Sequence, residues 1–162
     1  MVVICDTSPI INLAMIDCLD FSPKLFQEVI IPRQVFDEIV VKGIGKSGEI
    51  EVKNATWIKV LEFEDKVFYS EISQNLDEGE SVAITLAIEM GADLLIIDEE
   101  NGRRIAKEYN IKFTGLLGVL LRAKANGLLQ NVQPKIEELR KTANFWISEN
   151  LYNEVLKLAN EK

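Results

Sequence analysis

The chain has 162 residues, of which 48% are hydrophobic and 27% are charged, the composition of one ordinary globular domain. Its formal net charge is −8, so it lacks the overall basic character with which proteins usually hold long nucleic acids. It contains no histidine, which excludes serine–histidine and cysteine–histidine catalysis and leaves carboxylates, lysines, hydroxyls or a bound metal for any chemistry.

The sequence indicates neither a membrane protein nor a secreted one. No apolar run approaches the roughly 20 residues that cross a bilayer. The start MVVICDTSP also lacks the basic region of a signal peptide. Cys5 and Cys18 lie in or beside apolar stretches, and without histidine they cannot form a thiolate–imidazole metal site. We expect both to be small core residues of a protein in the reducing cytoplasm.

The chain begins with a predicted strand, a turn and a helix. Residues 2–5, VVIC, form a short apolar run, and the apolar residues of 10–19 recur at helical spacing. Asp6 follows the strand, and Thr7 or Ser8 is expected to cap the helix. An acid is therefore placed at the carboxyl end of a strand, facing a helix start.

A second strand and helix follow. Residues 29–32, VIIP, predict a strand, and residues 33–43 predict a helix that ends at a glycine. Glu38 lies at the border of the buried stripe of this helix. The next elements are expected to be a loop, a strand and a helix, over residues 43–55, 57–63 and 66–75.

The clearest strand lies in the middle of the chain. LDEGESVAITLAIEMGA first predicts a helix with Glu80 in its first turn, where the helix dipole favours carboxylates. Residues 93–98, DLLIID, then place four aliphatic residues between acids, which is typical of a strand buried on both faces of a parallel sheet. The strand ends at Asp98, and Glu99 and Glu100 follow before the next helix.

The last segments predict a strand over 111–115, a helix over 116–129 and two amphipathic helices in the C-terminal part. Strands that alternate with helices imply a three-layer α/β/α fold with a central, mostly parallel sheet. Ligands of such folds bind at the carboxyl edge of the strands. We expect one domain over residues 1–162, with a C-terminal helical extension over about 134–162.

Four acids are delivered to that edge from separate elements. Asp6 and Asp98 come from strand ends, whereas Glu38 and Glu80 come from helices. Like charges this close together cannot all stay ionised without a partner, so a cation is expected between them. Oxygen ligands favour Mg²⁺ or Mn²⁺, which activates water and stabilises charge on a phosphate under attack.

Each acid taken alone also has an ordinary structural explanation. Asp6 can cap a helix, Glu38 can be a solvated helix residue, and Glu80 can complement the helix dipole. Asp98 differs, because an acid that ends a fully apolar strand lies where α/β proteins place their active sites. The hypothesis of a metal site therefore rests on the four acids together.

The order of several motifs resembles a PIN domain. These motifs are DTSPIINLA, IPRQVFDEI, LDEGESVAITLAIEMGADLLIIDEENGRRIA and IKFTGLLGVLLRAKANGLL, and they cover the chain up to about residue 139. The last motif resembles the uncharacterised prokaryotic branch of that family with a GxLGxLxxAKxxGL segment. The resemblance implies a ribonuclease that depends on Mg²⁺ or Mn²⁺, of the kind that forms the toxin half of VapC-like toxin–antitoxin pairs.

By position, the resemblance implies catalytic roles for Asp6, Glu38, Glu80 and Asp98, and metal binding by Asp6, Glu80, Asp98 and Glu99. For the last metal-binding acid the alternatives Asp98, Glu99 and Glu100 stay open. In many family members this acid lies one or two residues after the strand.

Residues that would bind the substrate can be assigned in the same way. Thr7 and Ser8 resemble the small hydroxyl residues that follow the first acid and help to hold metal-bound water or phosphate. An acidic nuclease also needs local cations to approach RNA, and the candidates are Arg103, Arg104, Lys42 and Lys46. Neighbouring arginines on a helix cannot both face the site, and Arg103 is the residue that we expect to bind substrate.

Two functions compete. The first is a metal-dependent endoribonuclease, the toxin of a pair with a small antitoxin protein, which acts on RNA as a cytoplasmic homodimer. The alternative is a catalytically weak PIN-like module that binds nucleic acid or a basic protein segment. A response-regulator receiver is disfavoured, because no lysine follows Thr114 at a later strand end. Aromatic and apolar residues of 145–152 are expected in the core or a dimer surface more than in a nucleobase platform.

Overall fold

A five-stranded, all-parallel sheet forms the centre of the computed structural model, which describes residues 1–162. The strand order is β3-β2-β1-β4-β5. The strands are β1 (Val3–Cys5), β2 (Val29–Pro32), β3 (Ile58–Leu61), β4 (Leu94–Ile96) and β5 (Phe113–Thr114). The predicted fold class is confirmed.

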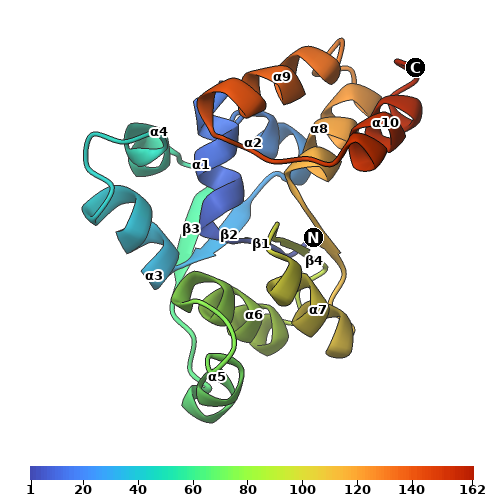
Figure 1. The fold of residues 1–162 in the computed structure, drawn as a ribbon. Coiled ribbons are helices and arrows are strands. Elements are labelled where there is room, and N and C mark those ends of the chain that lie inside the picture. The colour runs from blue at the N-terminus through green and yellow to red at the C-terminus, as the bar shows by residue number, and fades with distance from the viewer.

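Helices cover both faces of this sheet (Figure 1). One layer contains α1 (Thr7–Met15), α2 (Phe21–Phe26), α8 (Leu116–Ala125), α9 (Gln133–Thr142) and α10 (Glu149–Leu158). The opposite layer contains α5 (Lys66–Ile72), α6 (Glu78–Met90) and α7 (Glu100–Glu108). Three shorter helical segments follow β2, and they are α3 (Arg33–Phe36), η1 (Asp37–Val41) and α4 (Glu49–Asn54).

The central strands are apolar because both of their faces are covered. Every residue of β1, β2 and β4 is buried, as expected for a parallel sheet between two helical layers. β1 lies between β2 and β4, and its register pairs Cys5 with Ile96. The ladder continues one residue further, where the Asp6 N–H donates to the Ile96 carbonyl at 3.0 Å. The first acid of the chain is therefore fixed at the carboxyl edge, beside the end of β4.

α6 packs across β1, β2 and β4, and its sequence explains both of its ends. The Asp77 carboxylate accepts a hydrogen bond from the Glu80 N–H at 2.8 Å, and the Glu80 carboxylate accepts one from the Asp77 N–H at 3.3 Å. This reciprocal pair is a capping box. All residues from Ser81 to Ala87 are buried, and the helix ends at Gly91, whose φ of 57° suits glycine.

The helix after β2 differs from the prediction because its second half is a π-helix. Residues 37–41 form η1, and the Lys42 N–H donates to the Asp37 carbonyl at 2.8 Å, five residues back. Such wide turns are rare and frequently occur at functional sites. The apolar spacing of the sequence does not distinguish them from an ordinary α-helix.

Three further details of the first half were wrong. The stretch 43–55 is not a loop throughout, because α4 forms within it, with acids in its first turn, Lys53 in its last turn and Val52 buried. Asp6, and neither Thr7 nor Ser8, occupies the N-cap position of α1, because its extended backbone continues the strand ladder. The six residues of α2 are too few to show a helical period, and this helix was not predicted.

The two cysteines are core residues, as expected. Both are buried and neither forms a disulfide bond. Burial raises the pKa of both thiols, that of Cys18 to about 11, so they stay protonated at neutral pH. No helix combines the length and apolar character that crossing a bilayer requires.

The packing of the central sheet predicts a large loss of stability when β4 is truncated. Leu95 is fully buried, so Leu95→Ala should lower the free energy of unfolding by about 2–5 kcal/mol. The matched control Leu158→Ala removes the same atoms from an exposed position. It should change the free energy of unfolding by no more than about 0.5 kcal/mol. Urea unfolding followed by circular dichroism measures both values. Equal losses would contradict the described packing of β4.

Candidate active site

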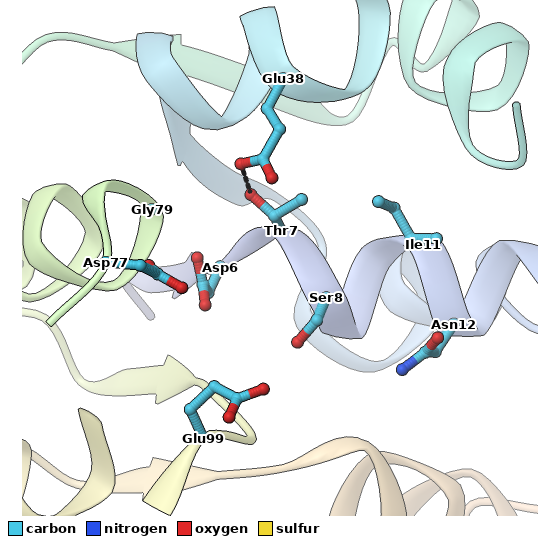
Figure 2. A pocket seen from close by; sticks show the side chains of 9 residues that line it. All are labelled: Asp6, Thr7, Ser8, Ile11, Asn12, Glu38, Asp77, Gly79 and Glu99. Atoms are coloured by element: carbon cyan, nitrogen blue, oxygen red, sulfur yellow. Dashed lines mark hydrogen bonds between the residues drawn. The ribbon is translucent and has the colours of Figure 1, made fainter. Parts of the chain in front are cut away.

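A small acidic cavity opens at the carboxyl edge of the sheet, between the starts of α1 and α6 (Figure 2). Its volume is about 190 Å³, and its lining residues are Asp6, Thr7, Ser8, Ile11, Asn12, Glu38, Asp77, Gly79 and Glu99. Four of these are acids and only one is hydrophobic. The cavity therefore suits a small cation, water and phosphate oxygens better than an apolar ligand.

Asp6 is the most deeply buried acid of this cavity, with 4% of its surface exposed. Its Oδ1 atom has no hydrogen-bond partner, and its side chain faces Asp77 (Figure 2). Burial raises the pKa of Asp6 to about 7, and the Thr7 N–H offsets this only in part. The charges of Asp77, Glu80 and Glu38 raise the pKa further. A buried oxygen among like charges is one that a cation would satisfy.

Gly79 allows the first turn of α6 to approach Asp6. A Cβ atom added at Gly79 would lie 2.9 Å from Asp6 Oδ1 and 3.4 Å from Thr7 Oγ1. The absence of a side chain therefore lets the carboxylate lie against the start of α6, where the helix dipole favours negative charge.

Glu38 reaches the cavity from the π-helix η1. Its Oε2 accepts a hydrogen bond from the Thr7 hydroxyl at 2.8 Å (Figure 2). This contact joins residues 31 positions apart and orients the hydroxyl directly after Asp6. Glu38 and Glu99 enter the cavity from opposite sides in this view.

Glu80 does not line the cavity itself and is only 5% exposed. It lines an adjoining hollow of about 290 Å³ that shares Asp77 and Glu99 with the cavity. Burial is the main reason that its pKa rises to about 7, and the charge of Asp77 adds to it. The Asp77 N–H opposes this rise in part, while the charge of Glu99 strengthens it.

Asp98 does not line the acidic cavity. Its Oδ1 accepts a hydrogen bond from the Leu116 N–H at 2.9 Å and lies 3.5 Å from Arg103 Nη2. Arg103 also donates from Nε to the Ile97 carbonyl at 3.0 Å. Burial raises the pKa of Asp98, whereas the Leu116 N–H and Arg103 lower it. Asp98 thus ties the end of β4 to α7 and α8.

The structure brings together part of the predicted set. Around the cavity lie Asp6, Glu38, Glu99, Thr7 and Ser8. Glu80 lines the adjoining hollow, while Asp98 and Arg103 pair with each other outside the cavity. Arg104 pairs with Glu108, so the two neighbouring arginines do face different ways.

Sequence reasoning missed two polar residues of the cavity. Asp77 was not singled out, although an acid three residues before Glu80 is the signature of a capping box. Asn12 lies on α1, one helical turn after Ser8, and nothing in its surroundings in the sequence marks it.

The cavity has the donor chemistry of a site for a hard cation. Its acids, hydroxyls and amide present oxygen atoms, which Mg²⁺ and Mn²⁺ prefer. In the positions that the side chains occupy, no group of three or more Asp, Glu, Cys or His side chains is arranged to hold one metal ion. The unpartnered Asp6 Oδ1 and the raised pKa values of Asp6 and Glu80 fit a cation that would draw these acids inward.

The raised pKa of Asp6 predicts that its ionisation opposes folding. The pKa is about 7 in the folded protein and about 3.9 in an unfolded chain. The folded state therefore binds more protons between these values, and stability falls as pH rises through this window. In chelator, Asp6→Asn should be more stabilising at about pH 8 than at about pH 4.

Urea unfolding at both pH values measures this difference. Asp20→Asn makes the same change at an exposed position and should show no such dependence on pH. If Asp6→Asn changed the free energy of unfolding equally at both pH values, this result would contradict the raised pKa of Asp6.

The contacts of Asp98 predict a structural cost when it is removed. Asp98→Ala leaves the Leu116 N–H and Arg103 without their acceptor, so the free energy of unfolding should fall by about 1–3 kcal/mol. The control Glu100→Ala removes an exposed acid from the first turn of α7 and should cost less than about 1 kcal/mol. Chemical unfolding compares the two, and equal small losses would contradict the tie between β4 and α8.

Comparison with known families gives one match. The family model DUF3368, described as a PIN domain, matches residues 2–161. The matched region contains all five strands and every residue that lines the acidic cavity. No curated protein matches the sequence.

Proposed function

Because this chain belongs to the PIN domain family, whose members are generally nucleases, we propose that it is a metal-dependent endoribonuclease. The reaction is hydrolysis of an RNA phosphodiester bond. The observation that carries the proposal is the buried Asp6 carboxylate, which has an unpartnered oxygen at the sheet edge and further acids around it. Such an arrangement is costly for folding and useful for holding a cation.

Four carboxylates are the proposed ligands of Mg²⁺ or Mn²⁺: Asp6, Glu80, Asp98 and Glu99. Among the acids after β4, Glu99 has the most support, because it lines the cavity. When bound, such an ion lowers the pKa of a water molecule and neutralises charge on the phosphate. We assign Asp98 the additional role of orienting Arg103, which it contacts.

The remaining residues position the reacting groups. Glu38 is the proposed general base, because it is an exposed carboxylate in the cavity and only its Oε2 accepts a hydrogen bond, from Thr7. Ser8 presents a hydroxyl to the same cavity and is proposed to donate to a phosphate oxygen. These groups stand on α1 and η1, so the fold holds them before substrate arrives.

A few basic side chains near the cavity are proposed to attract RNA to this acidic protein. Arg103 is proposed to contact the phosphate backbone next to the site. Lys42 lines a hollow of about 320 Å³ that shares Glu38, Asp77 and Gly79 with the cavity, which supports a second contact on the opposite side. Both cations would act together with the bound metal ion against the net charge of −8.

The toxin role is a further part of this proposal. A toxin of this kind would act as a homodimer and be held inactive by a small antitoxin protein. The acidic cavity favours a basic segment in such a partner. The same observation supports the alternative function, in which the chain is a catalytically weak module that binds nucleic acid or a basic protein segment.

Cleavage of a pooled RNA library tests the proposal. The purified protein should cut RNA with Mn²⁺ and not with chelator, because phosphate attack needs the charge and the water that the metal supplies. Asp6→Asn should lower the rate by about 100-fold or more, whereas the exposed control Asp20→Asn should leave it unchanged. Calorimetric titration of both variants with Mn²⁺ separates loss of metal from loss of chemistry. No cutting by folded protein with any divalent metal would favour the binding module.

A further inference from the structure

The acidic cavity offers little apolar surface to a nucleobase. Its volume is about 190 Å³, and Ile11 is the single hydrophobic residue among its nine lining residues. This lining suits a metal ion with phosphate oxygens and water better than a base. The bases of an RNA strand bound at the cavity are therefore expected on adjoining surfaces.

Three hollows adjoin the cavity, and they differ in chemistry. The hollow beside Glu38 and Asp77 has no hydrophobic residue in its lining, and the hollow beside Glu80 has one. The groove on the other side has a volume of about 840 Å³, and nine of its 18 lining residues are hydrophobic. Glu99 lines both this groove and the acidic cavity, so the two spaces adjoin. Only the groove offers an extended apolar surface to a base.

The apolar lining of the groove comes from distant parts of the sequence. Phe113, Leu117 and Leu121 supply part of it from β5 and α8, and all three are half-buried. The guanidinium carbon of Arg103 lies 5.7 Å from the centre of the Phe113 ring. The segment between α9 and α10, which includes Trp146, and α10 itself supply the rest.

The sequence favoured the core or a dimer surface over a nucleobase platform for residues 145–152, but Trp146 lines this groove with 84% of its surface exposed. No other large hydrophobic side chain of the protein is as exposed. Its neighbours hold the segment in place, since Ile147 is buried and Phe145 packs partly against the core. An indole on an anchored backbone offers a flat, solvent-facing surface, which is the surface on which single-stranded bases stack.

The charge of the groove selects which part of RNA fits it. Four acids line it, Asp98, Glu99, Glu100 and Glu154, against the single cation Arg103. Away from Arg103, this lining would repel a phosphate, whereas it would not repel an uncharged planar base. The acids also provide hydrogen-bond acceptors for the amino groups of a base.

We propose that this groove binds one unpaired nucleobase of the RNA substrate on the indole of Trp146, beside the phosphate held in the acidic cavity. The inference rests on the proposed function, because the groove matters only if RNA lies across the cavity. The groove would also make the protein prefer single-stranded RNA to duplex RNA, since a base within a duplex is not free to enter the groove.

Fluorescence of Trp146 tests the proposal without any cleavage. The parent protein carries Asp6→Asn and Trp57→Phe, so that it does not cut RNA and Trp146 is its only tryptophan. With Mg²⁺ present, a single-stranded oligoribonucleotide should quench this fluorescence to saturation, and a duplex of the same sequence should not. Trp146→Ala should weaken binding of labelled single-stranded RNA by about 5- to 150-fold. Trp146→Phe should recover part of the loss.

The control variant Ile44→Ala truncates an exposed apolar residue outside the groove and should bind RNA as the parent does. Equal RNA affinity of the parent and Trp146→Ala overturns the inference, even if the wild-type protein cuts RNA. A changed oligomeric state of Trp146→Ala at unchanged RNA affinity overturns it too, because the groove is then a contact between copies. Binding that depends on Trp146 in a protein that cuts no RNA supports the groove and contradicts only the proposed cleavage.

Discussion

The arrangement of this protein depends on one buried carboxylate, that of Asp6. An ionised carboxylate costs several kcal/mol to bury unless a partner compensates it. Three features keep it buried: the hydrogen bond from its N–H to the Ile96 carbonyl, the apolar strand before it and the missing side chain of Gly79. The fold thus keeps a carboxylate at a buried position where it lowers stability. Such a trade of stability for activity is a recurrent property of functional sites.

The acids around Asp6 are stabilised in part by the fold itself. Asp77 and Glu80 hold each other through the capping box at the start of α6, and Glu38 is held by the Thr7 hydroxyl. An ion that recruited Glu80 would compete with its hydrogen bond to the Asp77 N–H. The first turn of α6 is therefore both a helix cap and part of the candidate metal environment.

The sequence predicted the sheet well because buried parallel strands leave a strong local signal. Four aliphatic residues before Asp98 and the run before Asp6 were sufficient to place both acids at strand ends. The sequence could not predict that the Asp98 side chain turns away from the acidic cavity. Its orientation depends on a hydrogen bond from the Leu116 N–H, 18 residues further along the chain. The π turn before Glu38 and the groove beside Trp146 also depend on contacts between distant segments, which local patterns do not record.

Glu99 lines both the acidic cavity and the apolar groove. A molecule bound in either space would alter the position or screening of this charge, so occupancy of one space would change the affinity of the other space for its ligand. Thermodynamic linkage requires this coupling to be reciprocal. If a bound cation raises the affinity of the groove for a base, a bound base raises the affinity of the cavity for the cation by the same factor. Assembly of such a complex would then be cooperative, with one carboxylate as the shared element.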